Sequence, residues 1–231
     1  MLDISKIRAI TLDLDDTLWP VWPTIDRAEI ALQQWLANCA PATAALFADP
    51  HQRVHLRERA QTRLPHLHHD LSAVRQEMIR LALEQAGEDT KHAKAGFEVF
   101  FAERNVVTLF DDALAGLARL ALRYPVLAVS NGNADIHRVG IGQYFVGSVS
   151  ARDVGVGKPD PRIFNAAAKA LNLPPDQILH VGDDAHLDVV GALGCGMQTV
   201  WINRSDHLWT HESAPHAEAA TMLELCDLLQ A

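Results

Sequence analysis

The sequence predicts an α/β protein with a parallel β-sheet, helices on both faces of the sheet and an all-helical insertion after the first strand. Two observations predict this class. Short apolar runs alternate with amphipathic helical patterns in most of the chain, which is typical of βαβ units. Between the first and second runs lies a long stretch without a strand pattern, rich in Ala, Leu, Gln, Glu and Arg, which favour helix.

The predicted strands are short, β-branched and mostly apolar, as strands buried in a parallel sheet are. They are Ile7–Leu12, Pro125–Val129, Phe145–Val149, Ile178–Val181 and Met197–Ile202. Apolar residues at three- and four-residue spacing predict helices between them. These helices are Asp112–Leu122, Pro161–Leu171 and Leu187–Leu193, and a last helix is expected over Ala217–Leu229.

The stretch after the first strand is divided by Pro41, Pro50, Pro65 and Gly87, residues that interrupt helices. The amphipathic segments are Asp26–Ala40, His51–Leu64, Leu71–Ala86 and Thr90–Glu103. We therefore expect an α/β core made of residues 1–20 and 105–231, and a helical insertion of residues 21–104.

Composition and charge exclude several classes of partner and site. Twenty Lys and Arg against 29 Asp and Glu give a net charge of −9, which argues against nucleic acid or an anionic membrane surface as a partner. The three cysteines form no CxxC pair, so neither a disulfide framework nor a thiolate zinc site is indicated. No run reaches the ~18 apolar residues of a membrane span. We expect a cytoplasmic monomer or homodimer that binds a small molecule.

Polar residues follow four of the predicted strands. Ligands of open α/β sheets bind beyond the carboxyl ends of the strands, so these residues are expected to converge. They are Asp13, Asp15 and Thr17 after the first strand, Ser130, Asn131 and Gly132 after the second, Lys158 in the third loop, and Asp183, Asp184 and Asp188 after the fourth. Crowded carboxylates cannot all stay ionised without a cation, and Mg²⁺ prefers a few carboxylates with water and phosphate oxygens. Lys158 suits a phosphate oxygen, and Thr17, Asn131 and Gly132 are further candidates for binding the phosphate.

The spacing of the first two aspartates suggests their chemistry. Side chains at i and i+2 of an extended segment point the same way, so Asp13 and Asp15 share one side of the site. One can attack phosphorus, and the other can protonate the leaving oxygen and later deprotonate water. Ser130 and backbone amides after Asp13 can hold the phosphoryl oxygens, while Mg²⁺ and Lys158 offset the charge of the transition state.

These residues resemble the haloacid dehalogenase-like hydrolases. The family's four motifs correspond, in order, to Asp13-x-Asp15-x-Thr17, Ser130, Lys158-Pro159 and Gly182-Asp183-Asp184-x-x-x-Asp188. The resemblance implies a Rossmann-like core, a helical cap that closes over small substrates, and an aspartyl-phosphate intermediate. It also implies Asp13 as nucleophile, Asp15 as general acid and base, and Mg²⁺ held by Asp13, the Asp15 backbone carbonyl and Asp183. Asp184 and Asp188 would act around the metal, Asp188 through water or by orienting Lys158.

The sequence departs from the family at Asp16, where glycine is frequent. Dehalogenating members lack the second aspartate, so Asp15 points to phosphate chemistry. The segments Ser130–Asn133, Leu179–Asp184 and Gly196–Ile202 resemble the branch of bacterial FMN phosphatases, associated with 5-amino-6-(5-phospho-D-ribitylamino)uracil. His69 and Arg75 also resemble that branch and are candidates for cap specificity. Alternatively, Arg75 pairs with Glu77 or Glu84 on the helix surface.

The expected function is a Mg²⁺-dependent phosphatase of a small phosphorylated metabolite, with FMN or a riboflavin-pathway phosphate as the first candidate. A phosphomutase, or a sugar or nucleotide phosphatase of the same family, is the nearest alternative. Two further alternatives come from other classes: a phosphoacceptor signalling domain, and a non-catalytic phosphate-binding scaffold.

Overall fold

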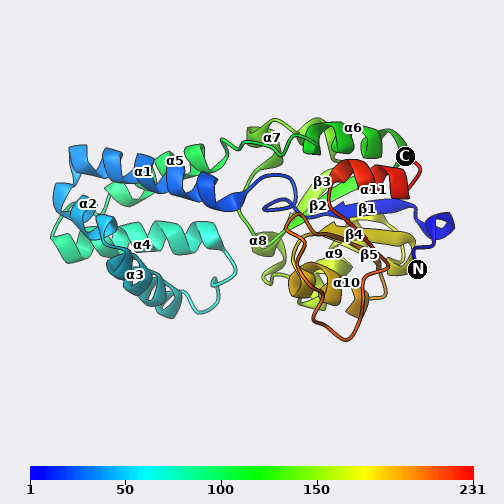
Figure 1. The fold of residues 1–231 in the computed structure, drawn as a ribbon. Coiled ribbons are helices and arrows are strands. Elements are labelled where there is room, and N and C mark those ends of the chain that lie inside the picture. Colours follow the sequence, from blue (N-terminus) through cyan, green and yellow to red (C-terminus); the bar gives the residue numbers. More distant parts are fainter. The chain divides into compact units, whose positions relative to one another are not determined.

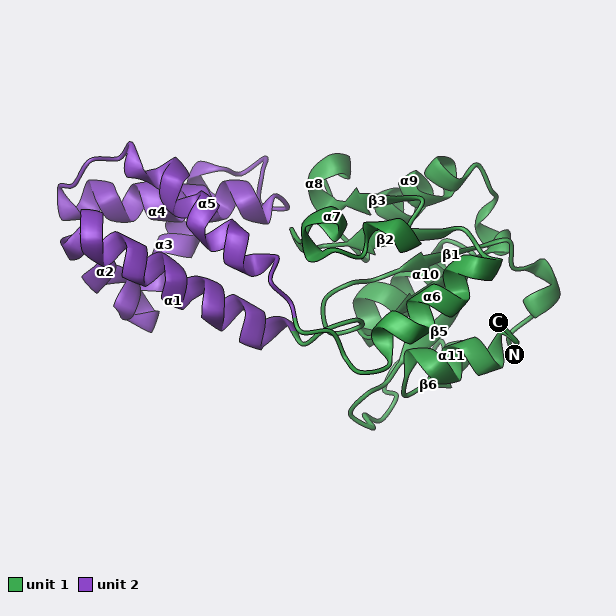
Figure 2. Cartoon of the chain, turned by 90° about the horizontal axis from the view of Figure 1, so that it is seen from above, with its two compact units in different colours: residues 1–20, 108–231 green, residues 21–107 purple.

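The computed structural model describes residues 1–231, which divide into two compact units (Figure 2). The first, here the core unit, combines Met1–Pro20 with Thr108–Ala231. The second, here the helical unit, is Val21–Val107. Each unit buries its own apolar side chains.

A six-stranded parallel sheet forms the middle of the core unit (Figure 1). Its strands are β1 (Ala9–Leu12), β2 (Val126–Ser130), β3 (Gly147–Ser150), β4 (Ile178–Gly182), β5 (Gln198–Ile202) and β6 (Ala217–Ala219), in the order β3-β2-β1-β4-β5-β6. The chain adds strands on one side of β1 and then crosses to the other side with β4, so the polar segments after β1, β2 and β4 meet at one edge. The α/β class predicted from the apolar runs is confirmed.

Helices cover both faces of this sheet (Figure 1). They are α6 (Ala113–Arg123), α7 (Ile136–Val139), α8 (Ala151–Val154), α9 (Pro161–Leu171), α10 (Gly191–Gly194) and α11 (Met222–Leu228). One π-helical turn, Ala185–Val190, precedes α10, and three 3₁₀ turns lie at Ile4–Lys6, Gly142–Tyr144 and Pro175–Gln177. The buried side of α9, with Ile163 and Phe164, packs against Leu127 and Val129 of β2.

The end of the core unit differs from the expectation of one helix over Ala217–Leu229. Ala217–Ala219 is the edge strand β6, which pairs with β5, and the helix begins only at Met222. Thr221 accepts a hydrogen bond from the Glu224 backbone N–H, and Glu224 accepts one from the Ala220 backbone N–H. This local capping fixes the start of α11, and sheet pairing overrides the helical preference of the alanines before it.

The helical unit contains five helices, α1 (Val21–Cys39), α2 (Pro41–Ala48), α3 (Pro50–Arg63), α4 (Leu71–Ala86) and α5 (His92–Arg104). Helix α2 was not expected; Pro41 occupies its first turn, where a missing N–H costs nothing. Asp70 caps the start of α4, and Gly87, with a left-handed φ of 69°, ends it. No helix of the protein combines the length and apolar character needed to span a membrane.

Arg75 makes different contacts from those expected. Its side chain is only 16% exposed and forms an ion pair with Glu29 of α1, Nη1 to Oε1 at 2.6 Å. The guanidinium also lies over the Phe100 ring, 4.2 Å from the ring centroid. The suggested partner Glu77 instead contacts Arg80 and Arg63. Arg75 is therefore a cross-link between α1, α4 and α5, and the suggested surface pairing with Glu77 or Glu84 is wrong.

We expect Arg75→Met to lower the free energy of unfolding by about 3 kcal/mol, because it leaves the mostly buried Glu29 carboxylate without its partner. Chemical unfolding followed by circular dichroism measures the change. The double variant Arg75→Met/Glu29→Gln should recover much of the loss. A change below about 1 kcal/mol, the range of exposed pairs, would contradict the buried cross-link.

Candidate active site

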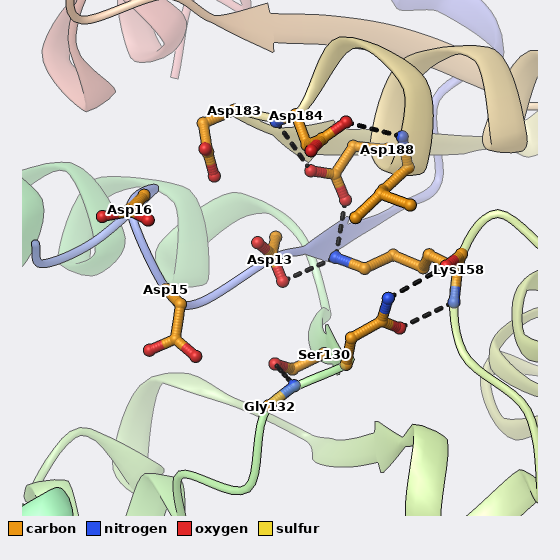
Figure 3. A pocket seen from close by; sticks show the side chains of 11 residues that line it. Asp13, Asp15, Asp16, Ser130, Gly132, Lys158, Asp183, Asp184 and Asp188 are labelled. Carbon is orange, nitrogen blue, oxygen red and sulfur yellow. Dashed lines mark hydrogen bonds and ion pairs between the residues drawn. The ribbon is translucent and has the colours of Figure 1, made fainter. Parts of the chain in front are cut away.

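A pocket of about 170 Å³ lies in the core unit at the carboxyl ends of β1, β2 and β4 (Figure 3). Nine of the residues that line it have a polar or charged side chain. The eleven lining residues are Asp13, Asp15, Asp16, Ser130, Asn131, Gly132, Lys158, Asp183, Asp184, Leu187 and Asp188. The strand order therefore gathers residues that are up to 175 positions apart in the chain (188 − 13) at one edge of the sheet.

Lys158 lies in the middle of the acidic groups. Its ammonium contacts Asp13 Oδ1 and Asp188 Oδ1, each at 2.6 Å (Figure 3). The Lys158 side chain is 2% exposed, so the charge is compensated by these two carboxylates and not by bulk water. Burial alone would lower the pKa of Lys158, but the two carboxylates outweigh it and raise the pKa.

The two partners of Lys158 have different electrostatic environments. Asp188 also receives hydrogen bonds from His180 Nε2 at 3.0 Å and from the Asp184 backbone N–H at 3.0 Å. Burial would raise the pKa of Asp188, yet Lys158 and His180 hold it at about 2. Burial, together with repulsion from Asp188 and Asp183, outweighs the attraction of Lys158 and raises the pKa of Asp13 well above its usual value. Asp188 is thus the firmly ionised partner.

Asp183 is held from two sides. Thr17 Oγ1 donates to its Oδ1 at 2.8 Å, and the Trp201 indole N–H donates to its backbone carbonyl at 2.7 Å. Burial, followed by repulsion from Asp188, raises the pKa of Asp183 to about 7. Carboxylate oxygens of Asp13, Asp183 and Asp188 lie within 4.8 Å of one another. Hard oxygen ligands at this spacing, with more negative charge than Lys158 can balance, could hold a divalent cation.

A tight turn after β1 presents the second aspartate. Asp15 accepts a hydrogen bond from the Trp19 indole N–H at 2.9 Å, and the Asp16 backbone N–H donates to the Trp19 carbonyl at 2.8 Å. Asp16 adopts a left-handed φ of 57°. Asp and Asn tolerate this conformation better than most residues, although glycine fits it best, which explains why aspartate can stand at this position.

The loops after β2 and β3 are joined through Asn131. Its side-chain Nδ2 donates to the Lys158 carbonyl at 2.9 Å, and its Oδ1 accepts from the Lys158 N–H at 2.6 Å. A Cβ at Gly157 would overlap the Asn131 amide, so glycine is needed for this approach. Ser130 Oγ accepts from the Gly132 N–H at 2.9 Å, so the Ser130 hydroxyl proton is not used in this bond and can be donated to another acceptor.

Three predicted residues make contacts within the protein that the sequence did not predict. Thr17, expected to bind phosphate, is fully buried, does not line the pocket, and donates its hydroxyl proton to Asp183. Asn131, also expected to bind phosphate, uses both its amide oxygen and its amide nitrogen on the Lys158 backbone. Asp184 caps the π-helical turn by accepting from the backbone N–H groups of His186 and Leu187. Each orients a neighbouring acidic or basic group.

Outside the core unit, His69 lies just before α4 in the helical unit. Its Nδ1 is buried and has no hydrogen-bond partner.

Several residues around the pocket were not predicted. Thr11 and His180 lie beneath it in β1 and β4, Leu187 lines it, and Trp201 holds Asp183 from β5. Thr11 and His180 are polar residues inside otherwise apolar strands, a signal that the sequence carries. Trp201 and Leu187 carry no such signal, since apolar residues are expected at their positions.

Gly182 makes room for Asp188. A Cβ at Gly182 would overlap the Asp188 carboxyl carbon. The last residue of β4 must therefore lack a side chain so that the Asp188 carboxylate can reach Lys158 across the strand end.

Comparison with known proteins gives one consistent family. A family model described as haloacid dehalogenase-like hydrolase matches residues 7–196. The 5-amino-6-(5-phospho-D-ribitylamino)uracil phosphatase YigB of Escherichia coli is 33% identical over 234 residues, covering 98% of each chain. A phosphoserine phosphatase of Thermus thermophilus is 34% identical over 157 residues, 65% of this chain and 63% of that one. A crystal structure described as a 2-haloacid dehalogenase, from Pseudomonas syringae, has a TM-score of 0.91 and 35% identity, covering 97% of this chain and 98% of that one.

The raised pKa of Asp183 predicts a pH-dependent stability. Without metal, the folded protein keeps a proton on Asp183 up to about pH 7, whereas the unfolded chain releases it near the ordinary value of 3.8. The folded state binds more protons in that interval, so this group lowers the free energy of unfolding as the pH rises from about 4 to about 7.

We expect metal-free Asp183→Asn to match the wild type near pH 4 and to exceed it by about 2 kcal/mol at pH 8, measured by chemical unfolding in a chelator. Adding Mg²⁺ at pH 8 should stabilise the wild type and leave the variant unchanged, because the ion needs the ionised carboxylate. An equal difference between the two proteins at both pH values would contradict this assignment.

Proposed function

The chain belongs to the haloacid dehalogenase-like hydrolases, and from that membership we propose that it is a phosphomonoester hydrolase acting on a small phosphorylated metabolite. The observation that carries the proposal is the 2.6 Å contact between Lys158 and Asp13. Asp183 lies beside Asp13, and Asp15 follows Asp13 two residues further along the chain. This set supplies a nucleophile, an acid, a cation and a metal ligand around one pocket.

We propose Mg²⁺ as the metal, held by Asp13, Asp183 and the backbone carbonyl of Asp15. The donor set fits, because it is all oxygen and carries surplus negative charge. Asp188 is engaged by Lys158, His180 and the Asp184 N–H, which supports a role in orienting Lys158. When bound, the ion supplies positive charge that keeps the facing carboxylates ionised and offsets charge on the phosphoryl oxygens.

Asp13 is the proposed nucleophile and Asp15 the proposed general acid and base. A carboxylate oxygen of Asp13 forms a bond to phosphorus while the bond from phosphorus to the leaving oxygen breaks, and Asp15 protonates that oxygen. Asp15 then takes a proton from a water molecule whose oxygen attacks phosphorus, breaking the bond to Asp13 and releasing phosphate. The Trp19 indole N–H, 2.9 Å from Asp15 Oδ1, supports a fixed orientation of the acid.

Ser130 and Lys158 are the proposed phosphate clamp. The Ser130 oxygen already accepts the Gly132 N–H, so its own proton is directed to an incoming oxygen. Lys158 provides a buried positive charge. The Asn131 side chain fixes the Lys158 backbone by hydrogen bonds to both its N–H and its carbonyl. Asn131 and Gly132 therefore support Lys158 and Ser130 through hydrogen bonds. Direct binding of phosphate by Asn131 or Gly132 stays a prediction.

Dehalogenation is the second candidate, favoured by the likeness to the Pseudomonas syringae protein described as a 2-haloacid dehalogenase. Displacing a halide from a 2-haloacid requires a nucleophilic aspartate but no acid for the leaving group. Asp15, an acid placed two residues after the nucleophile, therefore supports phosphate transfer. Halide release from 2-chloropropionate, measured beside phosphate release from an aryl phosphate, separates the two; we expect only phosphate.

Among phosphate substrates we propose FMN or a riboflavin-pathway phosphate first, a choice supported by the relative that acts on 5-amino-6-(5-phospho-D-ribitylamino)uracil. A panel that also contains sugar phosphates and nucleotides tests this, and a preference of more than tenfold for sugar phosphates would overturn it. Transfer of the phosphoryl group to an added sugar phosphate instead of water would identify a phosphomutase. The cytoplasmic location, the cap role of residues 21–104, phosphate binding by Thr17 and the specificity roles of His69 and Arg75 stay predictions.

We expect Asp13→Asn to abolish Mg²⁺-dependent hydrolysis of an aryl phosphate, and Asp15→Asn to lower kcat by about 10²- to 10⁴-fold because the leaving oxygen loses its proton donor. Released phosphate is measured, with circular dichroism to show that each variant is folded. Asp206→Asn, at an exposed aspartate outside the pocket, is the matched control and should keep full activity. Turnover by Asp13→Asn at the wild-type rate would exclude Asp13 as the nucleophile.

A further inference from the structure

Two buried polar residues beneath the pocket have no part in the chemistry described above. Thr11 of β1 is fully buried and His180 of β4 is 1% exposed, and they stand directly opposite each other in the parallel pairing of these strands. Thr11 Oγ1 lies 2.8 Å from His180 Nδ1. The Phe164 ring meets the imidazole edge to face, 5.1 Å between centroids, so packing and hydrogen bonding both restrict the ring. Neither residue lines the pocket.

The contacts of the imidazole determine where its proton lies. His180 Nε2 is 3.0 Å from Asp188 Oδ1, an oxygen that already accepts from the Lys158 ammonium at 2.6 Å. A carboxylate in an ion pair with lysine acts as an acceptor, so His180 Nε2 must be the donor. Burial lowers the pKa of His180, so the ring is neutral, and its Nδ1 carries a lone pair that accepts the hydroxyl proton of Thr11. The other acceptor near Thr11, the Leu179 carbonyl at 3.5 Å, is too distant to compete.

This tautomer completes the set of donors around Asp188. Three groups now donate to its carboxylate: His180 Nε2, the Lys158 ammonium and the Asp184 backbone N–H. Three donors fix the rotation of the Asp188 carboxylate, and its Oδ1 in turn locates the ammonium that contacts Asp13. A continuous chain of hydrogen bonds therefore runs from a strand hydroxyl to the proposed nucleophile.

We propose that Thr11 and His180 are positioning residues for the reaction: the Thr11 hydroxyl anchors the imidazole of His180 through Nδ1, and His180 holds Asp188 so that Lys158 stays on Asp13. The inference rests on the proposed phosphatase function for its kinetic consequence only. The hydrogen-bond chain itself is open to a test that needs no substrate.

Two variants of Thr11 distinguish a positioning role from a packing role, because the two roles predict opposite orders of kcat for them. Thr11→Val keeps the shape but loses the hydroxyl, and Thr11→Ser keeps the hydroxyl but loses a methyl group. We expect Thr11→Val to lower kcat about five- to tenfold with KM within about twofold, and Thr11→Ser to keep kcat within about twofold of the wild type. A Ser variant slower than the Val variant would overturn the proposal.

Variants of His180 test the second link. Gln and Met have nearly the same length and shape, but only Gln can donate to Asp188. We expect kcat to fall at least tenfold more in His180→Met than in His180→Gln. Equal losses in the two variants would overturn the role of the Nε2 donor. Should either variant fail to fold, the Thr11 pair still decides the question.

Nitrogen-15 NMR of the histidine side chains reads the tautomer of His180 directly in the full-length protein without substrate. We expect a proton on Nε2 in the wild type and in both Thr11 variants, and a changed Nδ1 chemical shift only in Thr11→Val, where Nδ1 has lost its hydrogen-bond donor. A proton on Nδ1 in the wild type would overturn the proposal. If the wild type hydrolyses no phosphomonoester, the proposed function fails, and the NMR result still decides the hydrogen-bond chain separately.

Discussion

The Lys158 ammonium is buried between Asp13 and Asp188, and the local structure follows from the need to compensate these three charges away from water. A buried ion pair is stable only when its remaining hydrogen-bonding groups are also satisfied. Asn131 meets this requirement at the Lys158 backbone, and His180 with the Asp184 N–H meets it at Asp188. Gly157 and Gly182 permit the close approaches that these contacts need. The motif residues are therefore parts of one network. A substitution in any of them alters the surroundings of one of the three buried charges.

The same network explains why the site calls for a further positive charge. Lys158 cannot offset Asp13, Asp183 and Asp188 together, so burial leaves the pKa of Asp13 and Asp183 raised. Ionisation of Asp13, the proposed nucleophile, is thus coupled to that of Asp183, the proposed metal ligand. A divalent cation bound here would contribute to the stability of the folded site as well as to the proposed chemistry.

Much of the architecture is predictable from the sequence because it depends on short-range patterns. The five apolar runs identify β1 to β5, and the family motifs identify the residues at their ends. The edge strand β6 was missed although Thr221 and Glu224 carry a capping-box pattern, because alanine-rich sequence favours helix until a neighbouring strand pairs with it. The partners of Thr17, Asn131 and Arg75 could not be predicted, since each lies on another element far along the chain. Residue types reveal which groups assemble, whereas long-range packing decides which atom each one meets.

The central position of β1 has a consequence for biosynthesis. This strand is made first, yet its two neighbours, β2 and β4, begin only at Val126 and Ile178. A growing chain must keep its apolar first strand unpaired while the helices of Val21–Val107, whose contacts are local, emerge and fold. Any fragment ending before Asp188 carries Asp13 without the full set of charges that balances it. Assembly of the pocket therefore requires β4 and the turn that follows it, and a product truncated before Asp188 lacks the complete set of lining residues.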